Sequence, residues 1–178
     1  MIKSIKICSF VLIFCCIGYL FVFDFFEVRD KEVQNRIIDN VFSVDVSDDV
    51  DNVQEDYLGY IYIPRFDVKR LIKDGTDLDL LDSLYVGVYY KSGFLYGDDL
   101  IILAGHNVRN VFSCLHKIDI GDFVYIGGRD FYRKFVVYDK LVVDEYNNDF
   151  FFSRDNELLL ITCDKKGFRL LVFLREVL

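Results

Sequence analysis

The chain has 178 residues and a formal net charge of −8, and 53% of its residues are hydrophobic. A chain of this length supports one hydrophobic core and an additional segment, and its apolar content excludes an intrinsically disordered protein. The excess of Asp and Glu excludes the basic surface that nucleic-acid binding requires.

Residues 7–23 form an uncharged apolar segment near the N-terminus. As a helix, this segment is about 25 Å long, which is near the lower limit for crossing a bilayer. Lysines precede it and carboxylates follow it, so the positive-inside rule places residues 1–6 in the cytoplasm and the rest of the chain outside. No small-residue cleavage site follows, which favours a retained single-pass anchor over a cleaved signal peptide. We therefore expect a cell-membrane protein with an extracellular main domain.

Residues 24–56 contain eleven acidic and three basic residues. Val33, Ile37 and Ile38 have helical spacing ahead of an acidic stretch, which predicts a short helix followed by a solvated stalk. We expect this linker to separate the membrane anchor from one folded domain over residues 57–178.

The folded domain alternates between short runs rich in β-branched and aromatic residues and clusters of Gly, Asp and Asn. This pattern predicts strands joined by turns, at the spacing of β-barrels and β-sandwiches. The eight predicted strands are residues 57–64, 68–75, 84–90, 98–105, 122–128, 131–145, 157–163 and 168–177. Short helical turns are predicted near residues 78–84 and 107–117. The predicted fold class is therefore all-β with short helices, and we expect a closed barrel.

The last two predicted strands are joined by the sequence DKKG, residues 164–167. Asp at the first position and Gly at the fourth favour a type I turn that begins at Asp164, with Gly167 in the bulge of a three-residue loop. This loop sets Cys163 directly opposite Arg169. Direct cross-strand partners share a face of the sheet, with Cβ atoms about 5 Å apart. The hairpin therefore predicts a thiol beside a guanidinium.

Arginine does not exchange protons near neutral pH, so a reaction at this thiol needs another proton carrier. His106 follows an apolar predicted strand, and Gly105 before it is expected to let the backbone turn sharply. A cysteine nucleophile needs a His that is near in space but not in sequence, so Cys163, His106 and Arg169 together predict cysteine-based catalysis. His116, on the polar side of the second short helix, is expected to be a solvated surface residue.

Cys114 and Cys163 are the only cysteines outside the apolar N-terminal segment. They could form a disulfide, or one could be a reactive thiol and the other a packing residue, and their spacing does not decide between these. If Cys163 is buried or bonded to Cys114, the domain is instead a non-catalytic cell-surface β-barrel module that binds a partner. The His and Cys residues lack the spacing of metal ligands, so no metal or other cofactor is expected.

Four motifs in residues 57–178 resemble those of the sortases, the membrane-anchored cysteine transpeptidases of Gram-positive bacteria. GYIYIPRFDVKRLIKDGT is similar to the opening strand motif, LIILAGHN to the histidine motif, LLLITC to the nucleophile motif and RLLV to the arginine strand. The resemblance implies an eight-stranded sortase-type β-barrel. It also implies that Cys163 is the nucleophile, His106 the general acid and base, and Arg169 the group that holds the substrate backbone and oxyanion. Thr162 and Ala104 are expected to contribute to substrate binding.

The resemblance further implies the substrates. Cys163 would attack a sorting-signal peptide, commonly of the Leu-Pro-x-Thr-Gly type, and form a thioacyl enzyme. An amine of a peptidoglycan precursor or a pilin lysine would then accept the acyl group. The five-residue connection from Cys163 to Arg169, the short stretch over residues 141–156 and the lack of a C-terminal transmembrane run favour a class A-like or class D-like enzyme over classes B and C.

Overall fold

The computed structural model describes residues 13–19, 21–22, 25, 28–29, 31–36, 38–39, 57–76, 84–89, 92–97, 99–147 and 158–177. The chain divides into two compact units, Met1–Arg36 and Ile37–Leu178. The predicted anchor, residues 7–23, lies partly outside the described residues, and residues 13–19 within it are helical. In the described part of the chain, no helix is both long enough and apolar enough to cross a membrane. Helical residues also occur at 31–36 and 38–39, where a short helix is predicted, whereas the predicted stalk after them lies outside the described residues.

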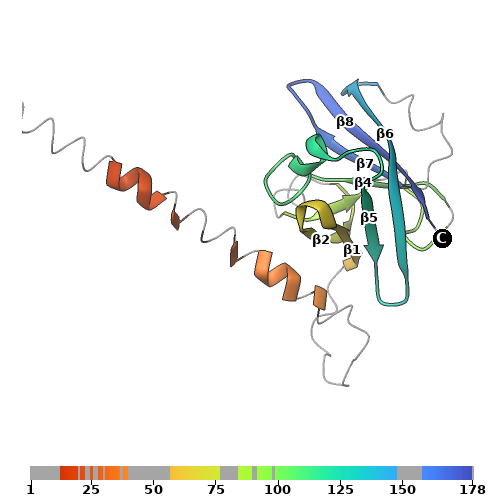
Figure 1. The fold of residues 1–178 in the computed structure, drawn as a ribbon, viewed down its shortest axis with the longest axis horizontal. Helices are drawn as coiled ribbons and strands as arrows, with labels where there is room; N and C mark the ends of the chain where they lie inside the picture. The colour runs from red at the N-terminus through yellow and green to blue at the C-terminus, as the bar shows by residue number, and fades with distance from the viewer. Residues whose placement is uncertain are drawn as a thin grey trace, which may run out of the picture. The chain divides into compact units, whose positions relative to one another are not determined.

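Eight strands close into a barrel, with the order β1-β2-β3-β4-β7-β8-β6-β5 around its wall (Figure 1). All eight predicted strands are confirmed, although β3 and β4 are shorter than their apolar runs. The strands are β1 (Tyr57–Ile63), β2 (Val68–Asp74), β3 (Val86–Val88), β4 (Ile101–Ala104), β5 (Phe123–Gly127), β6 (Tyr132–Asp144), β7 (Leu158–Cys163) and β8 (Phe168–Glu176). The predicted all-β barrel is therefore confirmed.

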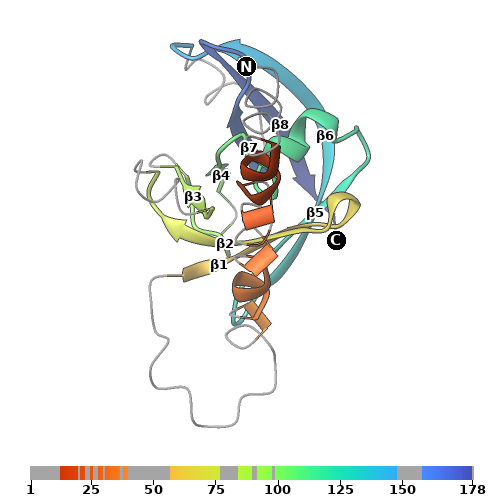
Figure 2. The ribbon, with the colours of Figure 1, turned by 90° about the vertical axis from the view of Figure 1, so that its left-hand side faces the viewer.

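The pairing of β4 with β7 decides which residues meet at one end of the barrel. These two strands are parallel neighbours although more than fifty residues separate them, and β8 returns antiparallel to β7 (Figure 2). The last residues of β4 and β7 and the first residues of β8 consequently lie at the same end. We call this the Cys163 end of the barrel.

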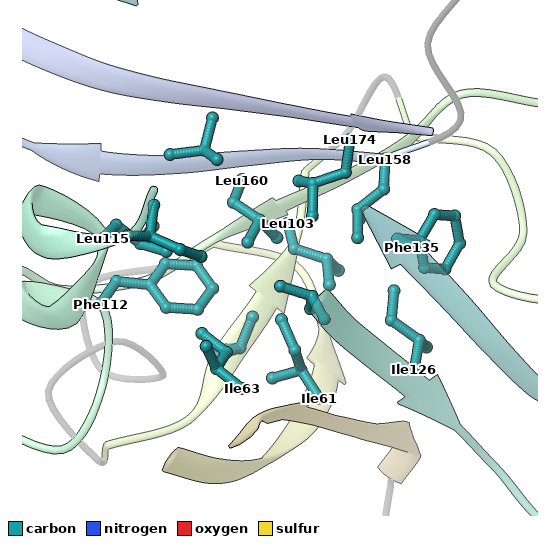
Figure 3. Close-up of a cluster of buried hydrophobic side chains, with 14 of the residues drawn as sticks. Ile61, Ile63, Leu103, Phe112, Leu115, Ile126, Phe135, Leu158, Leu160 and Leu174 are labelled. Atoms are coloured by element: carbon teal, nitrogen blue, oxygen red, sulfur yellow. The ribbon is translucent and has the colours of Figure 1, made fainter. Parts of the chain in front are cut away.

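The apolar residues of the barrel form two clusters, one inside and one on the outer face. Figure 3 shows part of the inner cluster, in which Leu103, Leu158 and Leu160 lie near Phe112 and Ile61. The outer cluster is formed by residues that alternate with the inner ones along β4, β7, β8 and β6. Its buried members are Ile102, Val143, Leu159, Ile161, Leu171 and Phe173. Because β7 contributes to both clusters, its sequence is a continuous apolar run without polar alternation.

Two short 3-10 helices interrupt the strands, η1 (Pro64–Phe66) and η2 (Ser113–Lys117). The helix predicted over residues 107–117 is therefore confirmed only in its last five residues. The preceding stretch is a series of turns, because the Phe112 amide donates to the His106 carbonyl at 3.1 Å and the Val111 amide donates to the Val108 carbonyl at 3.2 Å. The other predicted helical turn, residues 78–84, lies outside the described residues except for Leu84.

Candidate active site

The ends of β4 and β7 are joined by two hydrogen bonds just before the predicted catalytic residues. The Gly105 amide donates to the Ile161 carbonyl at 3.1 Å, and the Thr162 hydroxyl donates to the Gly105 carbonyl at 2.8 Å. Thr162 is only 2% exposed, so this hydroxyl bond is shielded from water. The backbone before His106 is thereby fixed to the backbone before Cys163.

His106 and Cys163 continue these two joined strand ends. Ala104 pairs with Ile161 in the parallel register, and continuing that register by two residues sets His106 opposite Cys163. Neighbouring strands lie about 4.8 Å apart, so the two residues begin at adjacent backbone positions. The half-buried His106 is also held by the bond from the Phe112 amide to its carbonyl.

Gly105 is required here for space. A Cβ atom added to Gly105 would lie 2.7 Å from Cδ2 of Phe112, which is closer than side-chain atoms approach one another. Gly105 is not among the residues with positive φ, so the sharp turn expected from its flexibility is not what the structure uses. The missing side chain instead lets the Phe112 ring pack against the strand end.

The final hairpin pairs Cys163 with Arg169, as the turn length predicts. The Asp164 amide donates to the Phe168 carbonyl at 2.9 Å, which confirms the predicted pairing across the turn. The turn itself is shifted by one residue from the predicted position, because its hydrogen bond runs from the Phe168 amide to the Lys165 carbonyl at 2.8 Å. Gly167 is then the third turn residue, and its φ of 82° is the conformation that glycine favours.

Cys163 and Arg169 lie on the outer face of the sheet. Ile161 and Leu171, two residues away on each strand, belong to the outer cluster, and strand side chains alternate between faces. Ala104 packs against the same cluster, whereas Thr162 points to the inner side. Ala104 therefore shares the face of the thiol, and Thr162 joins the strands beneath it. A direct contact of either residue with substrate stays a prediction.

The two thiols outside the N-terminal segment have different environments. Both are free, and Cys163 is exposed. Cys114 is partly buried in η2, its thiol contacts the Val111 carbonyl at 3.3 Å, and burial raises its pKa to about 11. Cys163 is therefore available at the surface, whereas Cys114 is a packing residue. Neither Cys163 nor Arg169 makes a side-chain hydrogen bond or ion pair within the described residues.

His116 is an exposed surface residue, as the sequence predicts, but its imidazole also has a polar contact. Its Nδ1 atom lies 3.5 Å from Oδ1 of Asp164, the residue directly after Cys163. The two residues are far apart in the chain, so no local sequence signal could have identified the contact. In the described part of the chain, no three His, Cys, Asp or Glu side chains gather as metal ligands would.

Comparisons with known proteins identify a family and solved structures that resemble this chain. A family model for the sortase domain matches residues 61–177. Sortase A from Corynebacterium diphtheriae is similar in structure, with 26% identity and a TM-score of 0.61 over 68% of this chain and 60% of that one. The chain thus spans less than two thirds of the length of that enzyme.

Two further structures share the fold at lower identity. Sortase C1 from Streptococcus suis has 24% identity and a TM-score of 0.63, over 69% of this chain and 74% of that one. A sortase D5 transpeptidase from Clostridium perfringens has 22% identity and a TM-score of 0.62, over 68% of this chain and 79% of that one. No curated protein sequence matches the chain.

Proposed function

Because the chain belongs to the sortase family, we propose that its barrel is a cysteine transpeptidase whose nucleophile is Cys163. The observation that carries this proposal is the register at the Cys163 end. Cys163 is paired with Arg169 on one side, and its strand is bonded through Gly105 to the strand end that carries His106 on the other. The backbone positions of Cys163, Arg169 and His106 are thus neighbours on three adjacent chain segments, which supports nucleophilic acyl transfer.

The first half of the proposed reaction forms a thioester. The reaction starts from a Cys163 thiolate and a protonated His106. The Cys163 sulfur adds to the carbonyl carbon of the scissile peptide bond, and negative charge develops on the carbonyl oxygen. Arg169 stabilises that oxygen, because a cation or hydrogen-bond donor aimed at the developing oxyanion lowers the barrier. The C–N bond then breaks as His106 donates a proton to the leaving amine nitrogen.

The second half transfers the acyl group to an amine. His106 accepts a proton from the incoming amine, whose nitrogen attacks the thioester carbonyl carbon. The C–S bond breaks, and the sulfur of Cys163 leaves with its electron pair. A new amide bond remains, and the enzyme returns to its starting state.

The proposed substrate is an extended peptide that reaches the exposed Cys163 on the outer face of the sheet. The apolar residues near Cys163 on this face, Ile161, Leu171 and Val143, are buried, so they support the sheet around the site. The peptide is proposed to be a sorting signal of the Leu-Pro-x-Thr-Gly type. The acceptor is proposed to be an amine of a peptidoglycan precursor or a pilin lysine.

The proposed location follows from the charge pattern of the N-terminal segment. Lysines before residues 7–23 and carboxylates after them favour a single-pass anchor with a cytoplasmic N-terminus and an extracellular barrel. The tight connection between Cys163 and Arg169 leaves a low wall beside the site. On that ground, we propose a class A-like or class D-like enzyme.

The experiment incubates the full-length protein, in mild detergent, with a Leu-Pro-x-Thr-Gly peptide and a primary amine. We expect cleavage between Thr and Gly, the amine-linked product, and a thioester at Cys163 that mass spectrometry detects. Cys163→Ala should abolish all three, whereas Cys114→Ala should retain them. Cleavage that survives Cys163→Ala would contradict the proposal. A wild-type protein that binds the peptide but never cleaves it would instead support the non-catalytic binding module.

A further inference from the structure

The contact between His116 and Asp164 has no role in the proposed reaction, yet it touches the residue next to the nucleophile. The His116 Nδ1 and Asp164 Oδ1 atoms are 3.5 Å apart, and the two side chains are 32% and 21% exposed. The contact is an ion pair when His116 is protonated. In the described residues it is the one polar side-chain contact between η2 and the β7–β8 hairpin.

The η2 side of this contact is firmly held. Leu115 is fully buried in the inner cluster. Lys140 of β6 donates from Nζ to the His116 carbonyl at 3.3 Å and to the Ile118 carbonyl at 2.7 Å. A cation at the end of a helical turn satisfies carbonyls that have no partner within the turn. The backbone of His116 is therefore fixed to β6 as well as to the core.

The hairpin side is held by backbone bonds within the hairpin and to the end of β6, where the Glu145 amide donates to the Gly167 carbonyl at 3.0 Å. Asp164 bonds to Phe168, and the pair Cys163 and Arg169 follows directly. Because side chains alternate along a strand, the Asp164 side chain points away from the face of Cys163 and towards the side where η2 packs. A pull on Asp164 would therefore tilt the tip of the hairpin, and with it the thiol and the guanidinium.

We propose that His116 is a positioning residue that acts through Asp164. It ties the tip of the β7–β8 hairpin to η2, and so fixes the direction in which Cys163 and Arg169 meet a bound peptide. This inference rests on the proposed function for its meaning in catalysis. The orientation of the exposed Cys163 thiol, which this inference concerns, can be tested without any peptide.

The test is a double-mutant cycle with His116→Leu, Asp164→Asn and the double variant in the full-length protein. Two rates are measured, the turnover of the peptide and amine and the alkylation of Cys163 by iodoacetamide. We expect each single variant to lower kcat about two- to fivefold and to change KM less than about twofold, because the pair is partly exposed. The double variant should be no slower than the slower single variant, since both substitutions remove the same contact.

Two matched controls and one rescue separate positioning from general damage. Lys117→Ala lies beside His116 and Lys165→Ala beside Asp164, and neither lysine bridges the two elements within the described residues. Both variants should keep wild-type rates. The exchange variant, His116→Asp with Asp164→His, should recover most of the lost kcat, and melting temperatures should stay near that of the wild type throughout.

The proposal is overturned if the two single effects multiply in the double variant, or if the lysine controls are equally slow. It is also overturned if Cys163 alkylation is the same in all variants. If the wild type cleaves no peptide, the proposed function fails separately, and the alkylation rates of the same variants still decide whether His116 positions the thiol.

Discussion

Two arginines at opposite ends of the barrel have different surroundings. At the end opposite Cys163, Arg133 of β6 binds both carboxylate oxygens of Glu176 of β8, at 2.9 and 2.5 Å. The same guanidinium donates to the carbonyls of Leu95 and Gly97, at 3.1 and 2.7 Å. At the Cys163 end, the side chain of the half-buried Arg169 makes no hydrogen bond or ion pair within the described residues.

The two arginines differ in whether another described residue pairs with their charge. Partly buried charges in proteins are normally paired, because removing a charge from water without a partner is unfavourable. Arg133 follows this rule and joins two strands to a loop. The side chain of Arg169 has no such partner among the described residues, and it lies beside the exposed Cys163.

The largest effect is expected at Arg169. Arg169→Leu should lower kcat for peptide transfer about 100- to 1000-fold, the range for losing one oxyanion-stabilising donor. Arg169→Lys should recover part of this activity, because lysine keeps the charge but not the planar fork of donors. The matched control is Arg175→Leu, which removes an exposed arginine from the other end of β8. Equal losses of kcat in the Leu variants of Arg169 and Arg175 would contradict the comparison between the ends.

Arg133 should show the opposite pattern. Arg133→Leu removes the bonds to Glu176 and to two loop carbonyls, and we expect the free energy of unfolding to fall by about 2 to 3 kcal/mol. Urea denaturation measures this change. The rate at which iodoacetamide alkylates Cys163 in the folded protein should stay at the wild-type value, because the site lies at the other end. A slower alkylation rate would show that the two ends are coupled.

The sequence predicts the strands well, because each strand is a local pattern. Alternation and turn residues identify all eight runs, and the turn length alone predicts that Cys163 pairs with Arg169. Local patterns do not identify long-range neighbours. Nothing in the sequence of β4 predicts that its parallel neighbour is β7, and the bond from Thr162 to Gly105 follows only from that pairing.

The parts of the site that the sequence misses depend on packing in three dimensions. Val111 and Leu115 are both buried, but residues 107–112 form turns, so the helix is restricted to residues 113–117. The tertiary structure places the exposed His116 beside Asp164. An exposed polar residue on a short helix has the same sequence pattern whether or not it contacts a residue that is distant in the chain.

Substitution of Thr162 tests whether its hydrogen bond to the Gly105 carbonyl, which joins β7 to the end of β4, supports the stability and activity of the Cys163 end. Thr162→Val keeps the side-chain shape but leaves the Gly105 carbonyl without its hydroxyl donor, so unfolding should become about 1 to 2 kcal/mol easier. It should also lower kcat, because His106 follows Gly105 directly and would move relative to Cys163. Thr162→Ser retains the hydroxyl and is the matched control. If Val and Ser variants have the same stability and kcat, the hydrogen bond does not hold the site together.

The smallest effect concerns pH, and it belongs to the end opposite Cys163. The hydrogen bonds from Arg133 hold the pKa of the Glu176 carboxyl below its ordinary value. A carboxyl whose pKa is lowered by folding contributes stability that is present above its ordinary pKa and is lost as the pH falls through the lowered one. The difference in unfolding free energy between wild type and Glu176→Gln should therefore be constant near neutral pH and should shrink as the pH falls below the ordinary pKa of Glu, about 4.3, and through the lowered one. Urea denaturation at several pH values measures it. Asp74→Asn removes a carboxylate that has no hydrogen-bond or ion-pair partner among the described residues, and it controls for general charge effects. A difference that grows as the pH falls would mean that Glu176 is not stabilised in its charged form by Arg133.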